Sequence, residues 1–148
     1  MSLIIRNLAA EDEPRWRSLW QDYCVFYEQD VPDAVTDAAW RRVLGCEEGF
    51  FGLVALQDNQ VVGFVNCITH GITWAINPIC YLEDLYVDPT VRGGGVGRAL
   101  IQSVVDRAKN KGWHRVYWKT NATNAVAQVL YNKVADRTQS IVYEVNDI

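Results

Sequence analysis

Apolar residues recur along this chain with two different periods, and the period changes from one segment to the next. Alternation of apolar and polar residues predicts a β-strand, whereas apolar residues spaced by three and four predict an amphipathic helix. The predicted strands are residues 3–8, 50–56, 60–70, 81–87, 114–120 and 138–145. The predicted helices are residues 9–28, 33–44, 96–111 and 124–134.

This order of elements predicts an α/β fold with one mixed sheet. The three strands between residues 50 and 87 follow one another closely enough to form an antiparallel meander, and helical crossovers connect the later strands. A chain of 148 residues has the size of one domain, and it contains no linker, internal repeat or low-complexity tract. We therefore predict a single domain spanning residues 1–148.

The segment 80–100 carries the strongest functional signal. Its strand ends at Asp88-Pro89, because proline has no N–H to donate to a ladder. The run Arg92-Gly93-Gly94-Gly95-Val96-Gly97 then leads into the predicted helix 96–111. Glycines allow neighbouring backbone N–H groups to converge on a phosphate, and the helix dipole adds partial positive charge. A strand, a glycine-rich turn and a helix start together predict an anion-binding site.

Two common phosphate-binding motifs do not match this turn. A P-loop requires lysine and then serine or threonine after the last glycine, where this chain has Arg98 and Ala99. A dinucleotide fingerprint that starts at Gly93 requires glycine or alanine at position 98. The pattern Arg/Gln-x-x-Gly-x-Gly/Ala does match. With the strand 81–87 and the segment 124–131, the turn resembles the acetyl-CoA loop of the GNAT superfamily of N-acetyltransferases.

The resemblance covers about residues 80–134. Within the superfamily, the pattern of residues is most similar to that of the spermidine/spermine acetyltransferases and the small histone and protein acetyltransferases. It implies a GNAT-like domain with flanking helices and a mixed sheet, whose parallel strands 81–87 and 114–120 splay apart around the thioester of acetyl-CoA. It implies direct acetyl transfer in a ternary complex to a primary amine, and also a homodimer. The amine would belong to a polyamine-like small molecule or to a protein lysine. The sequence departs from the family at Val134-Ala135-Asp136, where a glycine is usual.

The resemblance also assigns residues to acetyl-CoA. Backbone N–H groups of the glycine-rich turn would bind the pyrophosphate, and the exposed backbone of the strand 81–87 would pair with the pantetheine arm. The Val87 N–H would polarise the thioester carbonyl. Asn124 would contact the cofactor arm, although it is equally a candidate helix N-cap. The predicted cofactor-binding residues are Leu85, Tyr86, Val87, Arg92, Gly93, Gly94, Gly95, Val96, Gly97, Arg98, Asn124, Tyr131 and Lys133.

The reaction needs a base for the amine and a proton donor for the departing thiolate. An alkylamine has a pKa near 10.4, so only about one molecule in a few thousand is neutral at pH 7. Glu83 matches the base of the polyamine-acetylating branch, acting directly or through water, and Asp84 matches an acceptor contact. As neighbours on a strand they are expected on opposite faces, and either could be a polar group at the strand edge. Tyr131 is the expected proton donor, or alternatively a core aromatic.

Aromatic residues form a stripe on the predicted helix 9–28, at spacings of three and four. Core packing accounts for most of such a stripe. In the family this helix borders the acceptor pocket, so the resemblance makes Tyr23, Phe26 and Tyr27 substrate-binding candidates together with Asp84. Aromatic rings attract cations, which favours a small charged amine. The alternative to an enzyme is a non-catalytic acyl-CoA-binding sensor or interaction domain, which would need no base and no proton donor.

Charge and composition restrict the remaining classes of function. Fourteen basic against eighteen acidic residues, a net charge of −4, argues against a nucleic-acid-binding protein. No apolar run approaches the roughly 18 residues of a membrane span, and the first residues do not form a signal peptide. Four cysteines without a C-x-x-C pair predict free thiols in a cytoplasmic protein, with a secreted disulfide frame as the alternative. We predict no metal site.

Overall fold

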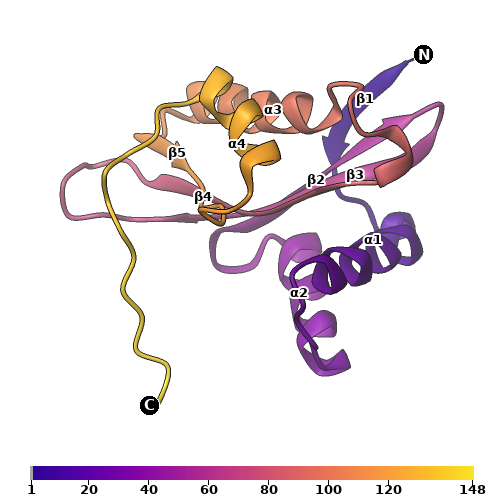
Figure 1. Cartoon of the computed structure of the whole chain (residues 1–148), viewed down its shortest axis with the longest axis horizontal. Coiled ribbons are helices and arrows are strands. Elements are labelled where there is room, and N and C mark those ends of the chain that lie inside the picture. The colour runs from indigo at the N-terminus through magenta and orange to yellow at the C-terminus, as the bar shows by residue number, and fades with distance from the viewer. Residues whose placement is uncertain (1) are drawn as a thin grey trace.

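The computed structural model describes residues 2–148, with Met1 outside this range, and contains a five-stranded sheet in the order β1-β2-β3-β4-β5. Strands β1 (Leu3–Asn7), β2 (Phe50–Gln57), β3 (Gln60–His70) and β4 (Ile79–Val87) pair antiparallel, and β5 (Arg115–Tyr117) pairs parallel to β4. Figure 1 shows the sheet between two helical layers. The predicted α/β fold with a mixed sheet and flanking helices is confirmed.

Helices cover both faces of the sheet. α1 (Glu13–Phe26) and α2 (Asp33–Gly45) lie on one face, and α3 (Val96–Lys111) and α4 (Ala125–Val134) lie on the other (Figure 1). Among the helices of residues 2–148, none combines the length and the hydropathy that a membrane span requires. The described part of the chain also forms three short 3₁₀ helices: η1 (Ala10–Asp12), η2 (Glu47–Gly49) and η3 (Pro89–Val91).

Each face of the sheet buries its own apolar cluster. On the α1 face the cluster is largely aromatic: Trp16 stacks on Trp20 with ring centroids 5.3 Å apart, and Trp40 and Phe64 pack against Trp16. On the α3 face, aliphatic side chains such as Leu100 pack on the sheet. The N-terminal half of the aromatic stripe is therefore core, as predicted.

Strand β4 contains a β-bulge. Asp84 pairs with Asn66 and Leu82 pairs with Cys67, so Glu83 has no partner of its own on β3. An extra residue shifts the alternation of side chains by one position. The prediction that Glu83 and Asp84 face opposite sides is therefore wrong. The residues that face α3 show this shift. Before the bulge they are the even-numbered Cys80 and Leu82, and after it they are the odd-numbered Leu85 and Val87.

Strands β4 and β5 separate after a short parallel ladder. Only Ile79–Tyr81 of β4 and Arg115–Tyr117 of β5 form pairs. β5 is shorter than the predicted strand 114–120, because the chain leaves the ladder after Tyr117. Within residues 2–148, residues 82 and 84–87 of β4 pair with β3 alone. The splayed arrangement implied by the resemblance is therefore present, and it leaves one edge of β4 open.

The C-terminal segment forms no strand, so the predicted closing strand 138–145 is wrong. After α4 the chain follows an extended path away from the sheet (Figure 1). Apolar alternation favours a strand, but a strand forms only where a neighbour supplies hydrogen-bond partners. Here Ile141, Tyr143 and Val145 stay 76%, 88% and 79% exposed.

Candidate active site

The glycine-rich turn leads into the N-terminus of α3. Gly93 and Gly95 have φ angles of 90° and 82°, a left-handed conformation that glycine adopts without steric cost. Gly95 is the N-cap of α3. In the described part of the chain, the N–H groups of Gly93, Gly94 and Gly95 donate no hydrogen bond. These free amides beside the positive end of the helix dipole can hold an anion.

The side chains around this turn differ in their exposure and in their contacts. Val96 is buried at 2% exposure, so its backbone rather than its side chain is available to a ligand. Arg98 is exposed in the first turn of α3. Arg92 donates from Nε to the backbone oxygen of Val87 at 3.0 Å, and its guanidinium lies 5.1 Å from the centroid of the Tyr86 ring. Arg92 therefore rests against the end of β4.

Glycine also permits close packing on both sides of this part of β4. A Cβ at Gly63 on β3 would lie 3.0 Å from the backbone oxygen of Tyr86, so glycine allows the two strands to approach closely here. A Cβ at Gly97 would lie 3.7 Å from Val87 and 3.8 Å from Leu130. Helices α3 and α4 thus meet the end of β4. On the open edge, the backbone of residues 85–87 has no strand beside it among residues 2–148.

Asp84 lies in a network of neutral donors on the α1 face. The Tyr23 hydroxyl donates to its Oδ1 at 2.8 Å, and Asn66 Nδ2 donates to its Oδ2 at 3.1 Å. Trp16 Nε1 donates to Asn66 Oδ1 at 3.4 Å, which orients that amide. Burial raises the pKa of Asp84, and the two hydrogen bonds partly oppose this rise. Sequence reasoning did not identify Asn66, because its role depends on pairing across the sheet.

Glu83 lies on the same face as a result of the bulge. Its charge acts on Tyr23, which lies on that face. Burial raises the pKa of Tyr23, and the charge and hydrogen bond of Asp84 and then the charges of Tyr27 and Glu83 raise it further. Desolvation by the surrounding protein, followed by the charge of Asp84, raises the pKa of Glu83 itself, and Lys119 lowers it. The side chain of Glu83 remains exposed to solvent. A carboxylate with a raised pKa that solvent can reach has the properties of a general base.

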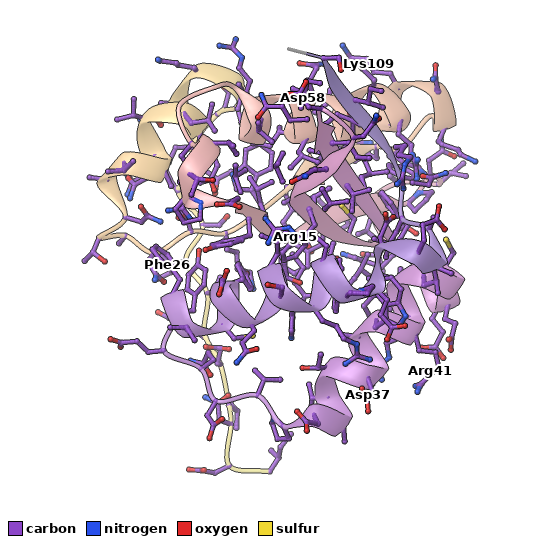
Figure 2. All side chains as sticks on the ribbon, turned by 90° about the vertical axis from the view of Figure 1, so that its right-hand side faces the viewer. Arg15, Phe26, Asp37, Arg41, Asp58 and Lys109 are labelled. Atoms are coloured by element: carbon purple, nitrogen blue, oxygen red, sulfur yellow. The ribbon has the colours of Figure 1, made fainter. Side chains whose placement is uncertain are left out.

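The C-terminal end of α1 supplies further aromatic rings. The Tyr27 ring lies 4.9 Å from that of Tyr23 and 5.0 Å from that of Phe26, centroid to centroid. Phe26 is 55% exposed at the end of the helix (Figure 2). Burial and then the charge of Asp84 raise the pKa of Tyr27. The structure therefore brings Tyr23 and Tyr27 to the carboxylates, whereas Phe26 lies at the rim.

Tyr131 reaches the same region from the other face of the sheet. Its ring packs edge-on against Trp118, with centroids 5.5 Å apart. Burial, and then the nearby Tyr27 hydroxyl, raises the pKa of Tyr131. Because α1 and α4 cover opposite faces, these two tyrosines can be neighbours only past an edge of the sheet. That edge is the open one of β4.

The two remaining predicted residues lie at opposite ends of α4. Asn124 is the N-cap of α4, because its Oδ1 accepts a hydrogen bond from the Ala127 N–H at 3.2 Å. The prediction that Asn124 caps this helix is therefore confirmed. Lys133 is exposed in the last turn. Among residues 2–148, no hydrogen bond or ion pair connects Lys133 to the glycine-rich turn.

Comparison with known proteins agrees with this geometry. Residues 10–135 match the acetyltransferase (GNAT) family. The chain is 32% identical over 146 residues to the D-amino-acid N-acetyltransferase of Saccharomyces cerevisiae, which covers 97% of this chain and 91% of that relative.

Solved structures of aminoglycoside acetyltransferases share the fold over nearly the whole length. AAC(6')-Iy, in complex with a CoA-linked bisubstrate analog, superposes with a TM-score of 0.85 at 20% identity and covers 100% of both chains. An enzyme from an uncultured soil metagenomic sample superposes with a TM-score of 0.81 at 23% identity, covering 99% of this chain and 96% of that one.

Proposed function

Because the chain belongs to the acetyltransferase (GNAT) family and uses acetyl-CoA as its acetyl donor, we propose that it acetylates the primary amine of a small cationic molecule. One observation carries the proposal: the bulge puts Glu83 and Asp84 on one face, beside the open edge of β4. Among residues 2–148, no cation forms an ion pair with Asp84. An acceptor ammonium would supply that charge, and the rings of Tyr23 and Tyr27 would favour it further.

Acetyl-CoA is assigned to the open edge of β4 and to the glycine-rich turn. The N–H groups from Gly93 to Gly97, including that of Val96, bind the pyrophosphate, and the backbone of residues 85–87 pairs with the pantetheine arm. Asn124 reaches the arm with its amide nitrogen, since its oxygen caps α4. Positive charge for the phosphates comes from three side chains: Arg92, Arg98 and Lys133.

The thioester supplies an activated acetyl group, and the chain supplies the proton transfers. Glu83 takes a proton from the acceptor ammonium, directly or through one water, and its raised pKa makes it a stronger base than an ordinary carboxylate. The amine nitrogen then bonds to the carbonyl carbon, while the Val87 N–H stabilises the negative charge on the carbonyl oxygen. As the carbon–sulfur bond breaks, Tyr131 gives its hydroxyl proton to the sulfur. The remaining excess proton on the amine nitrogen passes through water to the Tyr131 phenolate, which leaves a neutral amide and a neutral tyrosine, and Glu83 releases its own proton to solvent.

Three classes of acceptor fit this face in different ways. A polyamine-like amine matches the paired carboxylates, which agrees with the letter pattern around Glu83. An amino acid, the acceptor named for the yeast relative, carries a carboxylate that needs a cation. Lys119 is the cation near Glu83 that can bind this carboxylate. Its Nζ lies 5.4 Å from the Tyr81 ring centroid, and its charge lowers the pKa of Glu83. A protein lysine presents the same amine on a larger molecule.

A panel of amines tests the proposal. The protein is mixed with acetyl-CoA and, separately, with a polyamine, a diamine, an aminoglycoside, D- and L-amino acids and a histone-tail peptide, and thiol release is followed. We expect turnover with a small cationic amine and weaker turnover with the peptide. Lys119→Met should abolish turnover of amino acids and spare that of polyamines. Acetyl-CoA binding without thiol release for every amine would contradict the proposal and favour the sensor.

We also propose that the protein is a cytoplasmic homodimer. Among residues 2–148, β5 is the outermost strand of the sheet, and no strand pairs with its outer edge. The tail segment 138–145 has strand periodicity but no strand partner, so the tail of a second copy could pair with β5. Trp74 and Ile76 in the β3–β4 loop are 90% and 103% exposed and would extend this apolar interface. The four cysteines are free thiols, which supports a reducing compartment.

A further inference from the structure

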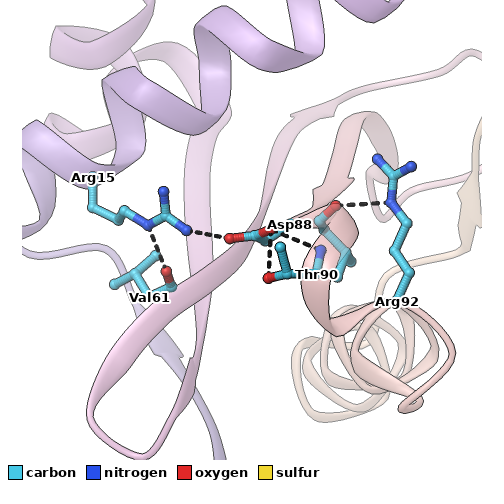
Figure 3. A network of polar contacts seen from close by, with 6 residues as sticks. Arg15, Val61, Asp88, Thr90 and Arg92 are labelled. Carbon is cyan, nitrogen blue, oxygen red and sulfur yellow. Dashed lines mark hydrogen bonds and ion pairs between the residues drawn. The ribbon is translucent and has the colours of Figure 1, made fainter.

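A polar network connects helix α1 to the start of the glycine-rich turn (Figure 3). Arg15 donates from Nη2 to Oδ2 of Asp88 at 2.6 Å, and from Nε to the backbone oxygen of Val61 at 2.9 Å. Asp88 directly follows β4, and Val61 lies at the start of β3. Figure 2 shows Arg15 between α1 and the sheet. One guanidinium therefore joins a helix to the ends of two strands.

Asp88 is fixed by hydrogen bonds on its other side as well. Its Oδ1 accepts from the N–H and from the hydroxyl of Thr90, both at 2.9 Å, which makes Asp88 the N-cap of η3. Its own N–H donates to the backbone oxygen of Val62 at 2.8 Å. The Asp88 side chain is 20% exposed and that of Arg15 is 40% exposed. The pair shares a single hydrogen bond, but each side chain also has further hydrogen-bond partners that fix its position, unlike most surface ion pairs.

The turn that follows η3 is anchored near its start. An added Cβ at Gly93 or Gly95 would meet no atom within 4 Å, so the turn projects from the body of the domain. Within the described residues, the side-chain hydrogen bonds made by residues 88–95 involve Asp88, Thr90 and Arg92, and their partners outside the turn are Arg15 and the backbone oxygen of Val87. Asp88 therefore anchors the turn together with Arg92 on β4 and Val91 on the core, and among these three Asp88 is the one that Arg15 connects to α1.

The same helix carries the aromatic side chains of the acceptor face. Tyr23 follows Arg15 by about two helical turns, and Tyr27 follows as the C-cap. A packed helix moves as one body, so a tie near its start constrains both tyrosines. We propose that Arg15 is a positioning residue that, through Asp88, holds the acceptor-binding helix and the cofactor-binding turn in one relative arrangement. This inference rests on the function proposed above, and Arg15 itself touches neither ligand.

Kinetics of Arg15→Met and Asp88→Asn test the inference. Arg15→Met keeps the aliphatic stem and removes both hydrogen bonds, whereas Asp88→Asn keeps a side-chain oxygen for Thr90. For each variant we expect the KM values of acetyl-CoA and of the amine both to rise about 3- to 10-fold, with kcat changed less than about twofold. The double variant should match a single variant, because both substitutions remove the same contact. Arg15→Lys should give intermediate KM values, since it keeps the charge beside Asp88 but cannot also reproduce the guanidinium hydrogen bond to Val61.

Arg17→Met is the matched control. Arg17 lies on the same helix, is 35% exposed and pairs with Glu13 and Asp37 at 2.8 Å each, without contact to Asp88. Its loss should leave both KM values unchanged. General destabilisation would reduce the fraction of active protein and hence kcat, but not KM. Thermal unfolding of each variant sets an assay temperature at which all are folded.

Three results would overturn the inference. The first is KM values of Arg15→Met equal to those of Arg17→Met. The second is KM effects of Arg15→Met and Asp88→Asn that add in the double variant. The third is a kcat loss at constant KM in Asp88→Asn, which would make the network merely structural. By contrast, wild-type protein that binds acetyl-CoA but acetylates no amine would refute the proposed function instead.

Discussion

The hydroxyl of Tyr23 donates a 2.8 Å hydrogen bond to Oδ1 of Asp84, which joins helix α1 to strand β4. Asn66 donates to the other oxygen. Both donors are neutral, and burial still raises the pKa of this carboxyl group. A cationic acceptor would add the favourable charge that the surrounding protein does not provide.

Asp84→Asn should therefore weaken acceptor binding. We expect the KM of the amine to rise about 10- to 100-fold, because a hydrogen bond to a charged group contributes roughly 1.5–3 kcal/mol. The dissociation constant of acetyl-CoA, measured by calorimetry, should not change. Asp106→Asn is the control, since Asp106 lies exposed on α3 and bonds to Gln102. An unchanged amine KM in Asp84→Asn would remove Asp84 from the acceptor site.

The raised pKa of Glu83 makes a prediction about pH. A base acts when deprotonated, so kcat/KM for a polyamine should increase as pH rises through the pKa of Glu83, above the ordinary value of about 4.3. Lys119→Met removes the cation that lowers this pKa, so the acid limb should move to higher pH. Lys109→Met, at the far end of α3, should leave the limb in place. A limb that does not move in Lys119→Met, or that persists in Glu83→Gln, would exclude Glu83 as the base.

Removal of the Tyr131 hydroxyl separates chemistry from binding. Tyr131→Phe keeps the ring that packs on Trp118, so acetyl-CoA affinity should change little. Turnover should fall by about 10²- to 10⁴-fold, the usual contribution of a general acid. Tyr143→Phe, in the exposed tail, controls for loss of a tyrosine hydroxyl. Wild-type turnover in Tyr131→Phe would show that another group protonates the thiolate.

Local signals predicted the conformation of the glycine-rich turn and the N-cap of α4. Gly93 and Gly95 have positive φ angles, which favour glycine, and Asn124 caps α4 by accepting a backbone N–H three positions later. Both features depend on nearby residues and can therefore be predicted from short stretches of sequence. The open edge of β4 came from the resemblance, since periodicity contains no information on where two parallel strands separate.

The acceptor side depends on contacts between distant segments. Strict alternation put Glu83 and Asp84 on opposite faces, and the bulge that overturns this is set by pairing with Asn66 on β3. The stripe on α1 correctly predicted a buried face, but spacing alone could not separate Trp16 in the core from Tyr23 at a carboxylate. The link from Arg15 to Asp88 spans much of the sequence, and no local pattern marks it.

An ion pair near the N-terminus should control acid stability. Asp12, 4% exposed, accepts hydrogen bonds from Arg6 Nη1 and Nη2 at 2.7 and 2.9 Å and from the Ala9 N–H at 2.8 Å. Burial alone would raise the pKa of Asp12, but these hydrogen bonds lower it below its ordinary value. A depressed folded-state pKa means that this stabilisation is present above about pH 4 and is lost as pH falls through the folded pKa.

Asp12→Asn should accordingly lower the free energy of unfolding at pH 7 by about 1–3 kcal/mol. The difference from wild type should shrink in acid, where the wild-type carboxylate is protonated. Denaturant unfolding at neutral and at acid pH measures both values, with exposed Asp30→Asn as the control. An equal difference at the two pH values would show that the charge of Asp12 has no part in the effect.

Deletion of residues 138–148 should convert the proposed dimer into a monomer. The segment leaves α4 in extended form, and its apolar residues are solvent-exposed in the single chain, while β5 offers an unpaired outer edge. Strand pairing between copies would bury both. Light scattering after size exclusion gives the mass of the full chain, of the truncated chain and of Gln139→Ala, a polar tail substitution that should remain dimeric. A full chain that is monomeric, with its tail amides protected from hydrogen exchange, would instead show that the tail pairs with its own β5. A truncated chain that stays dimeric would place the interface elsewhere.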